Sequence, residues 1–140
     1  MKDKLNPFHL AIPVSNLEES VAYYRDTLGL REGRSSNKWA DFDFFGHQLV
    51  CHVSNIINEQ ITNPVDGEEV PVPHFGVVLS IEKFEEFLLQ INDKNIDFII
   101  KPTIRFKGEI GEQRTMFFRD PSGNAIEIKA FRDIGTLFDS

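Results

Sequence analysis

The chain has 140 residues, a formal net charge of −7 and an apolar fraction of 41%, values typical of a globular domain and not of a disordered segment. Its basic residues form no cluster, which argues against nucleic acid or an anionic membrane as a partner, and no apolar run approaches the ~20 residues that a membrane span needs. One cysteine, Cys51, excludes an internal disulfide, and the N-terminus lacks the apolar core of a signal peptide, so we expect a cytoplasmic protein.

The first half of the chain predicts a strand, a helix and three further strands. Alternating apolar residues predict a strand over 8–14, and Ser15 followed by Glu18 forms a capping box that begins a helix. Apolar residues recur along this helix at helical spacing, and Gly29 is a natural stop. The three strands after it are expected at 30–36, 39–46 and 47–53.

A second copy of this pattern follows a linker at about 54–72, whose proline and acidic residues predict an irregular loop. The copy opens with a strand over 74–79 and a helix over 81–94. Three more strands are expected in DFIIKP (97–102), EQRTMFF (112–118) and NAIEIKAF (124–131), before a C-terminal segment that is either a short helix or a tail. The order is βαβββ twice, which predicts an α+β fold.

The two halves also match residue by residue. Superposing His9 on His74, an offset of 65 residues, places small Ala11 on small Gly76 and aligns the alternating apolar positions around them. We therefore expect one domain over 1–140 made of two modules. Module one covers about 7–53, the linker about 54–72, module two about 73–131 and the tail 132–140.

Strand alternation places His9, His74 and Glu127 opposite the apolar faces of their strands. If the two modules close face to face, these side chains converge. Two neutral imidazoles and a carboxylate suit a divalent transition metal, and three protein ligands leave positions open for water and substrate. Each residue alone could be a structural or solvated side chain, but two histidines at equivalent places of a repeat favour the metal site. On the strand over 47–53, the corresponding face carries Gln48, Val50 and His52.

Three segments, FHLAIPVSNLEESVAYYRDTLGL, PHFGVVLS and MFFRDPSGNAIEIKAF, resemble the vicinal oxygen chelate superfamily. That group includes glyoxalase I, bleomycin-resistance proteins, fosfomycin-resistance thiol transferases and extradiol dioxygenases. The resemblance covers about 7–131 and implies paired βαβββ modules that form an open barrel around a metal. It places His9, His74 and Glu127 at the positions of the three common ligands, which accept iron, nickel, zinc, manganese or cobalt.

Several positions depart from the patterns of individual members. Glyoxalase I usually adds a Glu from the first module, and the matching strand here offers His52, or Gln48 if a bulge shifts the register. Fosfomycin transferases place a Thr two residues after the first His, where this chain has Ala11. Extradiol dioxygenases use a Tyr where this chain has Phe117. Bleomycin-binding members lack the metal ligands altogether.

We therefore expect a metal-dependent, dioxygenase-like enzyme that acts on a small oxygen-rich substrate, because a three-ligand His/His/Glu site matches that pattern. A glyoxalase-like lyase or isomerase and a non-catalytic protein that binds a small molecule such as a drug are the alternatives. His52 and Glu127 are the expected catalytic residues, and Arg114, Gln48 and Phe117 the expected substrate contacts. Superfamily members commonly associate, so we expect a homodimer.

Three basic residues, Arg105, Lys107 and Arg114, precede the final hairpin. Arginine forms bidentate pairs with carboxylates and phosphates, so these residues could hold such a group on a substrate. The alternative for any one of them is a solvated basic stretch. The glycine-containing segment 106–113 could be a mobile flap over the site or an ordinary loop.

Overall fold

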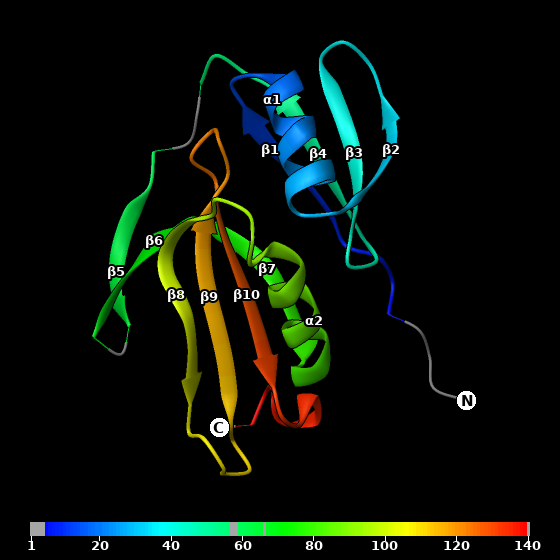
Figure 1. Ribbon diagram of the computed structural model, residues 1–140. Coiled ribbons are helices and arrows are strands. Elements are labelled where there is room, and N and C mark those ends of the chain that lie inside the picture. Colours follow the sequence, from blue (N-terminus) through cyan, green and yellow to red (C-terminus); the bar gives the residue numbers. More distant parts are fainter. Residues whose placement is uncertain (1–4, 57–58, 66, 140) are drawn as a thin grey trace. The chain divides into compact units, whose positions relative to one another are not determined.

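The computed structural model describes residues 5–56, 59–65 and 67–139. The chain divides into two compact units, residues 1–57 and 58–140, and each unit contains one of the expected modules (Figure 1). Both units combine a four-stranded sheet with a helix, which confirms the α+β class and the repeated βαβββ order.

The sheet of the first unit has the strand order β1-β4-β3-β2. Its strands are β1 (His9–Val14), β2 (Arg31–Ser35), β3 (Trp39–Phe44) and β4 (His47–Val53). β1 lies parallel to β4, and the other neighbours are antiparallel. The helix α1 (Leu17–Val21) continues as one π-helical segment, η1 (Ala22–Thr27), and Gly29 follows with a φ of 74°, as the sequence predicts.

The second unit repeats this topology with the order β7-β10-β9-β8. It consists of the hairpin β5 (Ile61–Val65) and β6 (Glu68–Val72), then β7 (His74–Ser80), α2 (Ile81–Ile91), β8 (Asp97–Arg105), β9 (Gln113–Arg119), β10 (Ala125–Phe131) and the short 3-10 helix η2 (Ile134–Thr136). β7 is parallel to β10, as β1 is to β4. The matching strand orders confirm that the sequence repeat is a structural one.

Two local expectations are wrong. The predicted loop at 54–72 contains the antiparallel hairpin β5–β6, which prolines within both strands conceal in the sequence. The cap of the first helix is Asn16, not Ser15, because the Asn16 side chain accepts the backbone N–H of Glu19 at 2.8 Å. The helix therefore begins one residue later than the capping box predicts, at Leu17, while the strand ends at Val14 as expected.

The core of the second unit lies between α2 and the sheet. α2 contacts β7, β9 and β10 and buries Phe84, Phe87 and Ile91, while Ile126 and Ile128 of β10 are fully buried. Full burial of side chains of this size stabilises by about 1.5–3 kcal/mol each. Because successive strand residues point to opposite faces, this packing turns Glu127 and its same-face neighbours away from the helix.

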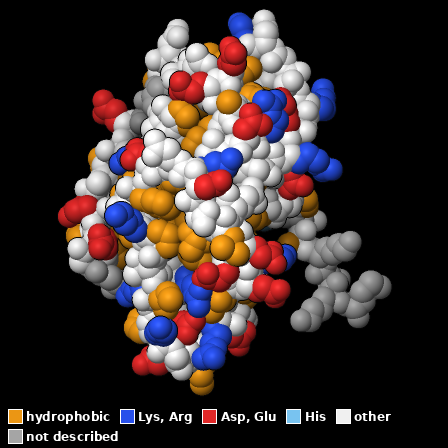
Figure 2. Space-filling model, viewed as in Figure 1, with side chains coloured by type: hydrophobic (Ala, Val, Ile, Leu, Met, Phe, Trp, Pro, Cys, Tyr) orange, Lys and Arg blue, Asp and Glu red, His pale blue; other side chains and the backbone are white. Residues whose placement is uncertain are grey.

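The surface carries charges of both signs. On the face shown in Figure 2, Lys and Arg side chains are interspersed with Asp and Glu. None of the helices within the described residues is long and apolar enough to cross a membrane.

Candidate metal and substrate site

The parallel pairing of β7 with β10 brings His74 and Glu127 together. In this register His74 lies beside Ala125 and Glu127 beside Gly76, so the two side chains are diagonal neighbours on the face opposite α2. The Nε2 atom of His74 lies 3.4 Å from Oε1 of Glu127, with 29% of the imidazole and 15% of the carboxylate exposed. A nitrogen and an oxygen donor thus converge in a partly buried position.

Hydrogen bonds orient both groups. Nδ1 of His74 lies 2.7 Å from the carbonyl oxygen of Pro71, which only accepts, so Nδ1 carries the proton and donates it. In the neutral imidazole this leaves the lone pair of Nε2 facing Oε1 of Glu127. The hydroxyl of Thr115 donates to the other carboxylate oxygen, Oε2, at 2.7 Å. Two electron-pair donors that face each other need a cation or a proton between them.

The arrangement fits a divalent ion. A backbone carbonyl accepts a hydrogen bond from the imidazole, and a hydroxyl donates one to the carboxylate. Hydrogen bonds of this kind orient the ligands of metal ions in proteins. Across the described residues no three His, Cys, Asp or Glu side chains form a group that could hold a metal ion. His74 and Glu127 therefore supply a pair of donors, and a complete site needs a further ligand.

A glycine and an aromatic ring shape the space around this pair. A Cβ atom on Gly76 would lie 1.5 Å from the carbonyl oxygen of Glu127, so only glycine permits this strand approach. The ring of Phe117 meets the His74 ring edge-on, with centroids 4.9 Å apart. Phe117, an expected substrate contact, thus lies beside His74, and its ring carries no proton donor or acceptor.

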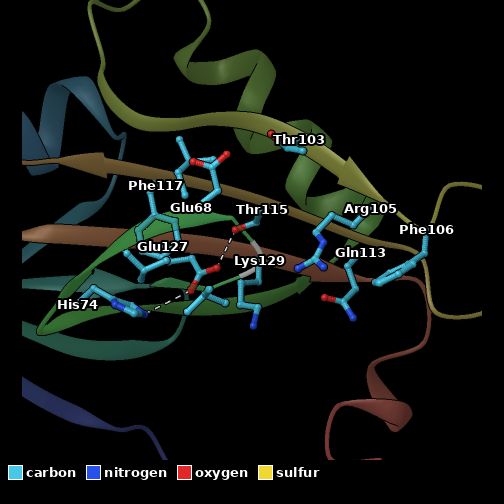
Figure 3. A pocket seen from close by; sticks show the side chains of 13 residues that line it. Glu68, His74, Thr103, Arg105, Phe106, Gln113, Thr115, Phe117, Glu127 and Lys129 are labelled. Atoms are coloured by element: carbon cyan, nitrogen blue, oxygen red, sulfur yellow. Dashed lines mark hydrogen bonds and ion pairs between the residues drawn. The ribbon is translucent and has the colours of Figure 1, made fainter. Parts of the chain in front are cut away.

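The pair opens into a cavity of about 690 Å³, within the range of small-molecule sites. Figure 3 shows His74, Phe117 and Glu127 grouped on one side of it, Arg105, Phe106 and Gln113 on the other, and Thr115 and Lys129 between them. Glu68 of the hairpin β5–β6 also lines the cavity. The segment expected to be a loop therefore contributes a wall of the site.

In the first unit, His9 is held by a chain of polar side chains. β1 and β4 pair His9 with Gln48, and Nδ1 of His9 lies 2.7 Å from Oε1 of Gln48. The amide nitrogen of Gln48 donates to the carboxylate of Asp41 at 3.1 Å. Because the carboxylate only accepts, the amide oxygen must face His9 and accept the proton of Nδ1. Nδ1 of His9 therefore carries the proton, and its Nε2 keeps the lone pair that is available to a metal ion, as in His74.

The repeat identifies the position in the first unit that matches Glu127. Glu127 pairs with Gly76, and the counterpart of Gly76 is Ala11, which pairs with Val50. The matching residue is therefore Val50, and neither His52 nor Gln48 occupies the place of a fourth ligand. His52 is exposed and pairs with Pro13, about 13 Å along the strands from the His9–Gln48 pair, so the structure does not support the catalytic role expected of it either. Gln48 lies against His9 as an orienting residue.

The expected role of Arg114 is not supported. Arg114 lies on the helix side of β9, where it forms ion pairs with Glu85 of α2 and, at 3.5 Å, with Glu112. The cations that line the cavity are Arg105 and Lys129. Lys129 follows Glu127 by two positions on β10, so alternation alone could have identified it.

Comparisons with known proteins match one family model and several curated proteins. The model of the Glyoxalase/Bleomycin resistance protein/Dioxygenase superfamily matches residues 6–128. The metallothiol transferase FosB of Staphylococcus saprophyticus is 25% identical over 131 residues, covering 94% of this chain and 78% of that protein. A FosB of Staphylococcus epidermidis is 26% identical over 123 residues, covering 86% and 79%.

Solved structures show the same fold. A glyoxalase/bleomycin resistance protein/dioxygenase from Alicyclobacillus acidocaldarius has a TM-score of 0.79 and 32% identity, covering 99% of this chain and 100% of that one. The fosfomycin resistance protein FosX from Listeria monocytogenes has a TM-score of 0.62 and 19% identity, covering 93% and 94%, a likeness of fold.

Proposed function

Since the chain belongs to the Glyoxalase/Bleomycin resistance protein/Dioxygenase superfamily, we propose that it is a divalent-metal-dependent enzyme that transfers a low-mass thiol to a small oxygen-rich substrate. The observation that carries the metal proposal is the 3.4 Å approach of His74 Nε2 to Glu127 Oε1, with both groups oriented by hydrogen bonds. His9 is the proposed third ligand, because Gln48 leaves its Nε2 lone pair available.

A bound ion would supply Lewis-acid chemistry, polarising substrate oxygens and stabilising developing negative charge. The residues around it orient the ligands and exclude water. Pro71 and Thr115 fix His74 and Glu127, and Phe117 covers the imidazole edge. Iron, nickel, zinc, manganese and cobalt all accept two imidazoles and one carboxylate, so the proposal names no single metal.

Thiol transfer is favoured among the reactions of the superfamily for two reasons. The curated relatives are named metallothiol transferases. In addition, Phe117 offers no proton-transferring group beside His74. When a thiolate attacks an epoxide carbon, the C–S bond forms as the C–O bond breaks and the proton given up by the thiol ends on the released oxygen, so no proton is removed from the substrate carbon. Ala11 stands where the fosfomycin transferases have a Thr, so we expect a substrate other than fosfomycin itself.

A dioxygenase is the second candidate, and one observation favours it. Val50 occupies the place that matches Glu127, so β4 supplies no fourth ligand and the set is two histidines and one carboxylate. That set with open positions is typical of non-haem iron oxygenases. A lyase or isomerase and a non-catalytic binding protein remain the further alternatives.

The test is a paired activity screen of the full chain loaded with each candidate metal. In the first assay, free cysteine is the thiol donor, and loss of its thiol is measured with fosfomycin as the reference substrate and with other small epoxides and electrophilic anions. In the second assay, oxygen uptake is measured with catechols as substrates. His74→Ala should abolish thiol loss, whereas His52→Ala, a matched exposed histidine on β4, should not. Oxygen uptake that requires iron would support the second candidate. Absence of any turnover in the native chain, together with a small-molecule affinity that is unchanged in His74→Ala, would contradict both candidates and indicate a binding protein.

We also propose a homodimer with a cytoplasmic location. Superfamily members commonly associate, and light scattering of the purified chain measures its mass directly. A mass of one chain, 16.1 kDa, at working concentration would contradict the dimer.

A further inference from the structure

Two cations lie on the polar face of the second unit, beyond the His74–Glu127 pair. Lys129 pairs with Thr115 across β10 and β9, and Arg105 pairs with Gln113 across β8 and β9. All four side chains point to the cavity. Lys129 follows Glu127 by two positions, a distance of about 7 Å along the strand. The cavity thus has a ligand-bearing end and a cationic end (Figure 3).

The cationic end is built around a strained residue. Phe106 has a φ of 55°, in the left-handed region that is costly for a bulky side chain. In this conformation its ring lies beside the Arg105 guanidinium, whose carbon is 5.1 Å from the ring centroid, and the ring also lines the cavity. Backbone strain of this kind is typical of functional sites, and here it positions a cation.

Lys129 is half-buried without a carboxylate beside it. Its ammonium nitrogen lies 5.8 Å from the Phe131 ring centroid, and within the part of the chain that the structure describes it forms no ion pair with an acidic side chain. A partly desolvated ammonium lacks the solvation that water would give it. An anionic ligand would restore that stabilisation.

The charge balance of the cavity points the same way. Among the described lining residues, the carboxylates Glu68 and Glu127 balance the cations Arg105 and Lys129. A divalent ion at Glu127 would make this described set of side chains net positive, and would add to the attraction that Arg105 and Lys129 already exert on an anion at their end. A concave site with net positive charge attracts anions.

We propose that this cationic end binds an oxyanion carried by the substrate, through Arg105, Lys129 and the Gln113 amide. The inference rests on the proposed function, because the metal ligands occupy the other end of the same cavity. The ligand is then a small molecule with metal-chelating oxygens at one end and a carboxylate, phosphate or phosphonate about 7–10 Å away. Thr103 and Thr115 also line the cavity, and because their hydroxyl protons are donated to the Lys101 carbonyl and to Glu127, their oxygens can accept hydrogen bonds from its middle.

The experiment is a titration of the full-length chain in metal-free buffer, followed by amide chemical shifts of residues 113–117. Inorganic phosphate and succinate are the two probes. We expect saturable shifts and a loss of affinity of about tenfold in both Arg105→Gln and Lys129→Gln, since a hydrogen bond to a charged group contributes about 1.5 kcal/mol or more. Stronger binding of phosphate would assign a phosphate or phosphonate group, and stronger binding of succinate a carboxylate.

Two further variants separate this inference from the proposed metal site. Lys101→Gln removes an exposed cation of β8 outside the cavity and should leave both affinities unchanged. His74→Ala should lose metal affinity and keep the phosphate or succinate affinity. Absence of saturable shifts, or equal affinities in the native chain, Arg105→Gln and Lys129→Gln, would overturn the oxyanion site even if the metal binds. Arg105→Lys, which keeps the charge without the bidentate geometry, is expected to fall between the native chain and Arg105→Gln.

Discussion

The imidazole of His74 and the carboxylate of Glu127 face each other at 3.4 Å because β7 and β10 run parallel with Gly76 beside Glu127. Each group is fixed from behind, by the Pro71 carbonyl and the Thr115 hydroxyl. Two lone pairs thus face one point, and among the described residues no further His, Cys, Asp or Glu side chain joins them in a metal-binding group. The predictions that follow test the parts of this arrangement separately.

Thr115→Val should weaken divalent-metal binding about tenfold or more without altering the fold. The hydroxyl of Thr115 donates a hydrogen bond to Oε2 of Glu127. Loss of a hydrogen bond that orients a metal ligand typically lowers metal affinity 10–100-fold. Thr103 is the matched control, because it pairs with Thr115 across the strands but donates to the backbone carbonyl of Lys101. Calorimetric titration checks both variants, and equal losses for Thr103→Val and Thr115→Val would speak against the orienting role.

Gln48→Leu should change the tautomer of His9. The Gln48 amide oxygen accepts the proton of His9 Nδ1, and Asp41 fixes the direction of that amide. Long-range proton–nitrogen spectra of the imidazole should show a mixture of tautomers in this variant, and metal affinity should fall about tenfold.

The double change Asp41→Asn with Gln48→Glu provides a rescue. The introduced carboxylate accepts the proton of His9 Nδ1, and the introduced amide donates to that carboxylate, so the native tautomer should return. A His9 tautomer that is the same in Gln48→Leu and in the native chain would show that Gln48 does not control it.

Gly76→Ala should destabilise the second unit. The added Cβ would lie 1.5 Å from the Glu127 carbonyl oxygen, so β7 and β10 must separate, and overpacking of this kind costs about 1–3 kcal/mol or more. Gly111→Ala is the control, because its Cβ would meet no atom within 4 Å and its φ lies outside the left-handed region. Urea denaturation gives the free energy of unfolding, and an unchanged midpoint for Gly76→Ala is incompatible with this strand register.

Arg114→Met should affect stability and not binding. The Arg114 guanidinium pairs with Glu85 and Glu112 on the helix side of the sheet. Because Glu85 is 45% exposed, loss of that pair should cost about 1 kcal/mol or less, and the 11% exposed Glu112 left without its cation should add to this loss. Metal and phosphate affinities should stay at their native values. A phosphate affinity that falls as far as in Arg105→Gln would return Arg114 to the role that the sequence first assigned to it.

The sequence predicts most of the fold because its periodicities are clear. The alternation around His9 and His74 repeats with the same offset, and the structure gives both strands the same parallel partner position. The sequence does not predict the hairpin β5–β6, because Pro64 and Pro71 interrupt the residue pattern typical of strands.

The candidate site is predicted less completely. Alternation correctly places Glu127 opposite the buried Ile126 and Ile128, since it depends on local periodicity alone. Alternation cannot show which residue of β4 lies beside which residue of β1. The sequence pattern therefore favours His52 as the fourth ligand, although Gln48 is the neighbour of His9.

The face of a residue near an irregular strand is equally hard to predict. Arg114 lies on the helix side, and Arg105 on the cavity side, of a strand pair whose register shifts twice. Those shifts lie between Phe98 and Thr103, so they hide the face of Arg105, whereas the regular alternation of β9 places Arg114 on the side of the buried Met116 and Phe118.

The most direct test of the account is calorimetric titration of the metal-free chain with a divalent transition metal. The native chain and His52→Ala should bind one ion per chain with the same affinity, and His74→Ala and Glu127→Gln should each lose at least about 100-fold, more than an orienting residue costs. Binding of equal strength in all four proteins would contradict the site.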